Sequence, residues 1–361
     1  MNLKQTRINF AAIAVVLICI GIVMIYSTSA IYALENLGDS AYYLKRHLLY
    51  VFIGLFFSSL VMAMDYQKLK VYAKPLLVFS FFLLVLLLIP GVSRSVGGAR
   101  RWFRVLGFSF QASELAKVAV IVYTADFLSR KKSHINTFLY GFLPILLVLG
   151  LVCLLIIMQP DLGTVVAIVS ICFLMCFVGG VKLTHMLSVI LGSLPLVYML
   201  VFSVSYRRNR ILAFLDPWKD PQGTGFQIIQ SLVALGSGGF WGVGLGQGKQ
   251  KLLYLPAAYT DFIFSIVGEE LGFIGTAAIV CLFIIFLFQA MKITLKAKDS
   301  FGQFLAFGLT CALAIEAIVN IGVATSLLPT KGLPFPFISY GGTSLIFNMI
   351  YVGLILNVGK G

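Results

Sequence analysis

The chain has 361 residues, of which 60% are apolar and only 11% are charged, with a formal net charge of +14. This balance is typical of an integral membrane protein and excludes a soluble globular enzyme. The sequence contains no P-loop, and the alternating glycines between Gly242 and Gly248 follow no predicted strand, so no nucleotide-binding motif is predicted. The three histidines, His47, His134 and His185, are scattered and show no metal-ligand spacing.

Long uncharged runs recur along the whole chain and predict an all-α polytopic membrane protein. Because a helix needs about 20 apolar residues to cross the hydrocarbon layer, we expect about ten transmembrane helices in one membrane domain, residues 1–361. The predicted spans are Ile8–Leu34, His47–Met64, Pro75–Ser93, Ser113–Ser129, Ser133–Pro160, Leu162–Val181, Leu183–Tyr206, Leu271–Met291, Gln303–Ser326 and Ser339–Val358. All six cysteines fall inside such spans and are predicted to be free thiols.

Charge in the short loops predicts the orientation of the chain. Basic residues cluster before the first helix and after the even-numbered helices, so the positive-inside rule places both termini in the cytoplasm. The long loop between helices seven and eight, residues 207–261, is then extracytoplasmic. The outer side is not depleted of cations, however, since Arg94, Arg100, Arg101 and Arg104 lie in one short outer loop. Two explanations stay open: an inverted topology, or outer cations that bind an anionic group such as a phosphorylated lipid head group.

Arg100 and Arg101 belong to the segment Gly97–Phe103, which precedes helix four. Its two glycines allow a tight turn, and the two arginines offer forked donors for phosphate oxygens. Trp102 and Phe103 suit a membrane interface. The segment is therefore either a phosphate-binding loop or an interfacial anchor with snorkelling arginines.

Two polar groups enter the membrane spans. In helix four, Glu114 and Lys117 are three residues apart and can pair on one face, after a possible cap at Ser113. This pair either lets the helix enter the membrane, or Lys117 faces a cavity and contributes charge to a site. Asp161, which follows Pro160 between helices five and six, is explained by capping of the next helix.

The long loop 207–261 is polar and carries three aspartates against six cations. Phe226, Ile229 and Val233 have helical spacing and predict an amphipathic helix on the membrane surface. Two of the aspartates each precede a proline and are typical of turns. The third, Asp261, lies at the boundary between water and lipid, where it is either the N-cap of helix eight or a half-desolvated general base.

Six segments, in chain order, carry a resemblance to a known family. They are Gly97–Phe103, Ser113–Lys117, Gln159–Thr164, Phe214–Gln230, Thr260–Phe264 with Gly268–Gly272, and Pro336–Ser344. Together they resemble the SEDS family, whose members include FtsW, RodA and SpoVE, and the resemblance covers nearly the whole chain. Phe214–Trp218 and Thr330–Leu333 are most similar to the FtsW and SpoVE branch.

The resemblance implies a peptidoglycan glycosyltransferase of the bacterial cytoplasmic membrane, acting in cell division or a related septal or sporulation process. Its substrate would be lipid II, the undecaprenyl-diphosphate-linked disaccharide peptide, polymerised at the outer face. The implied partners are a class B penicillin-binding transpeptidase and divisome proteins, and no nucleic acid. The family's catalytic aspartate corresponds to Asp261. Family members often have His two residues earlier, where this chain has Tyr259, so a role for a histidine there does not carry over.

The chemistry of such a reaction agrees with this residue. Asp261 would take the proton from the acceptor sugar's 4-hydroxyl as that oxygen attacks the anomeric carbon of a lipid-linked diphosphate donor. A glycosidase needs a second carboxyl as acid, whereas here cations or a divalent metal ion of unassigned ligands would stabilise the departing diphosphate. The predicted substrate-binding residues are Arg100, Arg101, Lys117, Arg207 and Lys251, with Glu114 beside Lys117.

Two other functions compete with polymerisation. A lipid II flippase would place a polar site near the bilayer midplane, and Glu316 with Asn320, one turn apart in helix nine, is the intramembrane pair that would serve. A hydrogen-bonded pair between helices explains these residues equally well. A scaffold that only recruits other proteins would not need a carboxylate beside a cationic outer loop.

Overall fold

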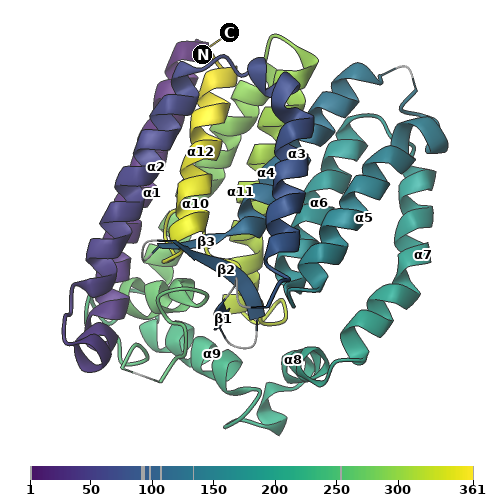
Figure 1. Cartoon of the computed structure of the whole chain (residues 1–361). Coiled ribbons are helices and arrows are strands. Elements are labelled where there is room, and N and C mark those ends of the chain that lie inside the picture. The colour runs from purple at the N-terminus through teal and green to yellow at the C-terminus, as the bar shows by residue number, and fades with distance from the viewer. Residues whose placement is uncertain are drawn as a thin grey trace.

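The computed structural model describes residues 2–90, 94–96, 99–105, 108–132, 134–252 and 254–360. Its long helices stand side by side as one bundle, with the two ends of the chain together at one end (Figure 1). The helices are α1 (Leu3–Leu37), α2 (Tyr42–Ala63), α3 (Lys68–Leu86), α4 (Ala112–Arg130), α5 (Leu143–Ile157), α6 (Leu162–Val178), α7 (Leu183–Phe202), α8 (Ser205–Leu215), α9 (Phe226–Gly238), α10 (Ile263–Leu295), α11 (Ser300–Ala324) and α12 (Gly342–Val358).

The all-α membrane fold is confirmed. In the described part of the chain, seven helices are long and apolar enough to cross a membrane: α1, α2, α3, α5 with the π-helical turn before it, α7, α10 and α11. α6 and α12 are apolar but have only 17 residues each, and α4 carries charged residues that lower its hydropathy. These ten helices correspond in order to the ten predicted spans, and the number that cross the bilayer stays a prediction.

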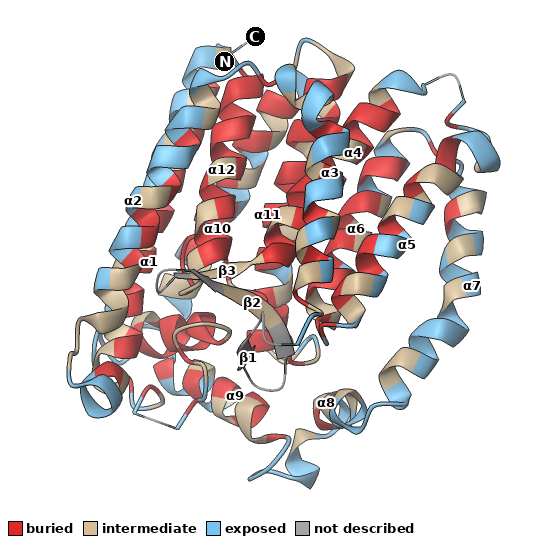
Figure 2. Cartoon of the chain, in the orientation of Figure 1, coloured by how far each residue is buried: buried red, intermediate tan, exposed pale blue. Residues whose placement is uncertain are grey.

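Burial distinguishes the centre of the bundle from its edge. Figure 2 shows buried residues along α4, α11 and α12, and exposed residues along α2, α3 and α7. Only Met186 is buried among the described residues of α7, although most residues of that helix are apolar. Exposed apolar side chains on the outer helices are typical of a protein whose solvent is lipid. The described cysteines are all free thiols, as predicted.

A small antiparallel sheet precedes α4 and was not expected from the sequence. Its strands are β1 (Arg94–Val96), β2 (Ala99–Val105) and β3 (Phe108–Gln111), in the order β1-β2-β3. Trp102 pairs with Gln111 and Phe103 with Phe110. The sheet lies towards the end of the bundle that carries α8 and α9, away from the chain termini (Figure 1). The predicted tight turn at residues 97 and 98 lies outside the described residues.

α10 bends at Gly272, where φ is 66° and ψ is −165°. The segment 239–244 bridges the break: the N–H groups of Val243 and Gly244 donate to the carbonyl oxygens of Glu269 and Glu270, both at 3.0 Å. In return, the N–H of Phe273 donates to the carbonyl oxygen of residue 239 at 2.9 Å. A side chain at Gly272 would collide with the nitrogen of residue 242, 2.3 Å from an added Cβ, so only glycine fits.

The first part of the long loop is mainly helical, since it contains α8 and α9. The helical spacing predicted within residues 226–233 is confirmed by α9, which packs against the first half of α10. Ile228 and Ile229 are buried there, and the Ser231 hydroxyl lies 2.6 Å from the Ser265 hydroxyl. The same face is not wholly as predicted, because Val233 is exposed.

Candidate active site

Asp261 lies in a tight turn immediately before α10. The backbone N–H groups of Thr260, Asp261 and Phe262 converge on the carbonyl oxygen of Ala257, at 3.1, 3.1 and 3.3 Å. Ala257 has a φ of 58°, in the left-handed region that few residues with a Cβ adopt. The N-cap of α10 is Phe262, without a side-chain cap. The alternative that Asp261 caps this helix is therefore wrong, and its half-buried carboxylate makes no hydrogen bond to the described residues.

The segment 333–340, which precedes α12, holds the backbone of this turn. The Ser339 hydroxyl donates to the carbonyl oxygen of Thr260 at 2.6 Å. The N–H of Tyr340 donates to the carbonyl oxygen of Tyr259 at 2.9 Å. The turn is thus fixed from a part of the chain about 80 residues away, which a sequence pattern does not reveal.

Asn320 of α11 joins the turn to a second loop. Its side chain is 1% exposed, and its Nδ2 donates to the carbonyl oxygens of Asp261 and Leu333, each at 2.9 Å. Leu333 belongs to the loop between α11 and α12. One amide group therefore fixes the distance between two loops of the candidate site.

Two arginines contribute positive charge near Asp261. Burial raises the pKa of the Asp261 carboxyl to about 6, and the charges of Arg210 and Arg101 oppose this rise. Arg210, in α8, donates to the carbonyl oxygen of Thr330 at 2.9 Å, and its guanidinium lies 4.4 Å from the ring centre of Tyr206. A half-buried carboxylate with a raised pKa beside cations is typical of a general base.

Arg101, in β2, reaches the turn between α5 and α6. Its Nε donates to the carbonyl oxygen of Gln159 at 3.2 Å, and its Nη2 donates to that of Pro160. Its Nη1 lies 3.8 Å from Asp161 Oδ1. Asp161 caps α6, as predicted, by accepting from the N–H of Thr164 at 3.2 Å. The sheet therefore carries the predicted cation Arg101 to the candidate site and anchors it there.

The loop between α11 and α12 adds two residues that the sequence analysis did not single out. Gly332 is exposed, and a Cβ added there would lie 3.0 Å from Asp261 Oδ2. Lys331 is half-buried without a hydrogen-bond partner among the described residues, and burial lowers the pKa of its ammonium. In the sequence, Thr330–Leu333 is marked only by its similarity to the family, because nothing local links it to Asp261.

Glu114 and Lys117 require a correction. The predicted pair exists, with Lys117 Nζ 3.0 Å from both carboxylate oxygens of Glu114, but Lys117 also binds Glu316 Oε1. The side chains of Lys117 and Glu316 are each 1% exposed and that of Glu114 is 4% exposed. Lys117 therefore does not face a cavity, and both predicted substrate-binding residues belong to the bundle core. The predicted cap at Ser113 is also wrong, because α4 begins at Ala112.

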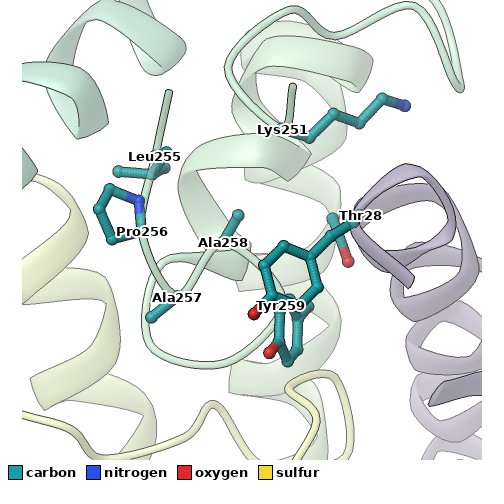
Figure 3. A pocket seen from close by; sticks show the side chains of 8 residues that line it. Thr28, Lys251, Leu255, Pro256, Ala257, Ala258 and Tyr259 are labelled. Atoms are coloured by element: carbon teal, nitrogen blue, oxygen red, sulfur yellow. The ribbon is translucent and has the colours of Figure 1, made fainter. Parts of the chain in front are cut away.

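Lys251 is likewise committed to a buried partner. Its Nζ lies 2.6 Å from Glu270 Oε1 and donates to the Ser27 hydroxyl of α1 at 3.1 Å. Lys251 also lines a pocket of about 300 Å³ between α1 and the segment 255–259, with Tyr32 and Tyr259 among its walls (Figure 3). This pocket touches the turn that carries Asp261, but Asp261 does not line it, so the predicted contact of Lys251 with a diphosphate at Asp261 is not supported.

Arg207 and Arg100 are the two remaining predicted cations. Arg207 is half-buried, and its Nη1 donates to the carbonyl oxygen of Leu200 in α7 at 2.8 Å. The backbone of Arg100 is in β2, but its side chain lies outside what the structure describes. Across the described ranges, no three His, Cys, Asp or Glu side chains come together in a way that could hold a metal ion. Ligands for the predicted divalent ion therefore stay unassigned.

Comparison with known sequences identifies close relatives over nearly the whole chain. The family model FTSW_RODA_SPOVE, described as cell cycle protein, matches residues 7–361. A probable peptidoglycan glycosyltransferase FtsW from Geobacter sp. (strain M18) is 47% identical over 345 residues, which cover 96% of this chain and 94% of the relative. Stage V sporulation protein E from Bacillus subtilis (strain 168) is 45% identical over 362 residues, which cover 100% and 99% of the two chains.

Solved structures with the same fold also match nearly the whole chain. One, described as "Structural coordination of polymerization and crosslinking by a peptidoglycan synthase complex", contains a chain with a TM-score of 0.80 and 27% identity, covering 97% of this chain and 96% of that one. The rod shape determining protein RodA of Thermus thermophilus matches with a TM-score of 0.72 and 25% identity, covering 97% and 95%.

Proposed function

This chain belongs to the FtsW, RodA and SpoVE family of cell cycle proteins, and we propose that Asp261 is the general base of its reaction. The protein is a membrane-bound peptidoglycan glycosyltransferase of cell division or a related sporulation process. Its donor and acceptor are the lipid-linked disaccharides of lipid II and the growing strand. The carboxylate of Asp261 is half-buried, does not cap α10 and lies near two arginines. This single observation supports the assignment.

The reaction needs one base and a stabilised leaving group. Asp261 accepts the proton of the acceptor's 4-hydroxyl while that oxygen forms a bond to the donor's anomeric carbon. The bond from this carbon to the diphosphate oxygen breaks, and the lipid diphosphate leaves with the electron pair. Partial burial favours this role, because it keeps the carboxylate basic, whereas a fully solvated Asp would be a weaker base near pH 7.

Cations near Asp261 are suited to the departing diphosphate. Arg101 and Arg210 act on the charge of Asp261, and Lys331 lies next to Gly332, which approaches the carboxylate. Positive groups held in place before the reaction stabilise developing negative charge without reorganisation. We assign this role to Arg101, Arg210 and Lys331, in place of Lys117 and Lys251, whose ammonium groups are buried against carboxylates.

Removing the Arg101 charge is expected to slow polymerisation. Arg101→Gln keeps donors for the carbonyl oxygens near Asp161 but loses the positive charge, so glycan synthesis should fall by about 10²-fold. The measurement is the initial rate of polymerisation of labelled lipid II by purified protein. Arg208→Gln, at an exposed position of α8, is the control for loss of a cation and should retain the rate. Equal rates in both variants and the parent would contradict the electrostatic role of Arg101.

Asn320 should matter to the reaction beyond its effect on stability. Asn320→Ala releases the backbone of Asp261 and should lower turnover. Asn357 offers a matched comparison, since it is 4% exposed and donates to the carbonyl oxygens of Val61 and Met64, far along the chain from the site. Each variant leaves two carbonyl oxygens without their donor, which destabilises by about 1–3 kcal/mol for each buried oxygen.

Thermal unfolding and polymerisation rates, measured side by side, distinguish the two effects. Similar losses of stability with a much lower rate only in Asn320→Ala would support a positioning role. If Asn357→Ala loses as much rate as Asn320→Ala, the loss follows from stability alone.

We propose that both termini are cytoplasmic and that residues 207–261 face outwards. The two ends of the chain lie together, while α8 and α9 lie at the other end of the bundle (Figure 1), as this topology requires. Single cysteines at Lys131 and Gln222, in a cysteine-free background, should differ in labelling of intact spheroplasts by an impermeant maleimide. Labelling at Gln222 is expected, and labelling only at Lys131 would invert the topology.

Glu316 and Asn320 are the two residues that a flippase would use, and their contacts favour polymerisation instead. Glu316 is occupied by Lys117 and by the Asn348 amide, and Asn320 donates to two backbone carbonyls. Interhelical bonding therefore accounts for both. The decisive assay uses purified protein with labelled lipid II, alone and with a class B penicillin-binding transpeptidase, the partner that we propose. Glycan chains should form, and lipid II translocation across liposomes without any glycan would favour the flippase.

A further inference from the structure

A cluster of ionisable side chains is buried where α4, α11 and α12 meet. Glu114, Lys117 and Glu316 are 3%, 1% and 1% exposed. The Lys117 ammonium binds both carboxylates, at 3.0 Å from each oxygen of Glu114. Glu316 lies one helical turn from Asn320 in α11, so the cluster is close to the candidate site without taking part in the proposed glycosyl transfer.

The cluster is one positive charge short. With all three groups ionised it carries two negative charges and one positive charge. An uncompensated charge in the interior of a membrane domain is costly, by several kcal/mol or more. The other groups that act on it are Tyr351, a neutral phenol, and Asp161, which is negative and already paired with Arg101. No described neighbour therefore supplies the missing positive charge.

Two polar groups beside the cluster lack hydrogen-bond partners among the described residues. Asn348, in α12, is 1% exposed and donates from Nδ2 to Glu316 Oε2 at 3.1 Å, while its Oδ1 has no donor among the described residues. The hydroxyl of Tyr351, which is fully buried, has no partner there either. Because the nitrogen and oxygen of an amide exchange places by a half rotation, a carboxylic acid at Glu316 would find an acceptor in Asn348.

We propose that this cluster is a proton-binding site, in which one proton taken from water is held by the Glu114 and Glu316 carboxylates. The bound proton forms an O–H bond and converts one carboxylate into a carboxylic acid. The cluster then contains one acid, one carboxylate and one ammonium, and is neutral. A single proton thus removes the net charge and gives the Asn348 amide oxygen a donor once the amide has turned.

The chain contains a matched pair that needs no such proton. Lys251 and Glu270 form a one-to-one ion pair, with side chains 3% and 0% exposed and Nζ 2.6 Å from Oε1. This pair is neutral as it stands. Glu270→Gln is therefore the control for loss of a buried carboxylate, and it should destabilise the protein because it leaves Lys251 unpaired.

Infrared spectroscopy tests the proposal independently of enzymatic activity. The purified protein, at about pH 8 so that Asp261 with its pKa of about 6 is ionised, should show the carbonyl stretch of a buried carboxylic acid, sensitive to deuterium exchange. Glu114→Gln and Glu316→Gln should each lose this band, because the remaining carboxylate pairs with Lys117 one to one. Glu270→Gln should keep it.

The stability of the same variants gives a second measurement. Glu114→Gln and Glu316→Gln should unfold thermally within a few degrees of the parent, whereas Glu270→Gln should unfold at a clearly lower temperature. A parent protein without the acid band would overturn the proposal. So would a band that survives in either Gln variant of the cluster, or failure of both of these variants to fold.

Discussion

Replacing Asp261 by Asn is expected to lower the rate of glycan synthesis by about 10²–10⁴-fold, the usual contribution of a positioned general base. Asn has nearly the same size but cannot accept the acceptor's proton. The measurement is the initial rate of lipid II polymerisation by the purified variant. Asp216→Asn, at an exposed position that ends α8, is the control and should leave the rate near that of the parent.

The folded state should tolerate this change. Because burial raises the pKa of Asp261 from its ordinary 3.8 to about 6, the free energy of unfolding falls as the pH rises between these values and stays lower above pH 6. The neutral Asn avoids that loss. The variant should therefore unfold at a temperature no lower than the parent near neutral pH. Robust glycan synthesis by well-folded Asp261→Asn would refute the role of Asp261.

The pH profile of the parent enzyme gives a further readout of the same group. The base must be ionised, so kcat/KM should rise with pH through about 6 and fall on the acid side as Asp261 takes up a proton. Activity that stays constant well below this pH would show that another group accepts the proton.

Lys117→Met is expected to destabilise the protein by about 3–5 kcal/mol, because it leaves Glu114 and Glu316 buried without their counter-ion. Because the ammonium is buried against two carboxylates, loss of stability is the expected result of removing it. Unfolding in detergent, followed by thermal or denaturant titration, provides the measurement.

Adding Glu114→Gln and Glu316→Gln to Lys117→Met separates lost charge pairing from lost packing. The triple variant has a neutral cluster, so most of the stability should return. A single Lys117→Met variant as stable as the parent would mean that the two carboxylates find another partner, contrary to the contacts described above.

The helices could be predicted from the sequence because lipid imposes one simple rule, a long apolar run for each span. α10 shows where this rule fails. The predicted span begins at Leu271, because Glu269 and Glu270 interrupt the apolar run before it. The helix itself begins at Ile263. Those two carboxylates are satisfied by the 249–251 segment and by Ser27 of α1, which no local pattern indicates.

The candidate site could also be predicted only in part from the sequence. Asp261 could be predicted because it precedes an apolar run and lies within a family motif. The contributions of Arg210 and Asn320 depend on hydrogen bonds to carbonyl groups, which every residue possesses. That of Lys331 depends on a loop that approaches Asp261 only in the folded chain. The sheet before α4 was missed because its strands are only three to seven residues long and their pairing depends on register.

The bridge across the bend of α10 bears on how the long loop between α7 and α10 can change in evolution and in engineering. Residues 239–244 complete the hydrogen bonding of a membrane helix, so an insertion there would leave buried backbone groups without partners. The turn around Pro221 and Gln222 is exposed and, among the described residues, makes no backbone hydrogen bond to α10. Differences in loop length between relatives, and sites for epitope tags, should therefore fall in that turn, while the bridging segment keeps its length.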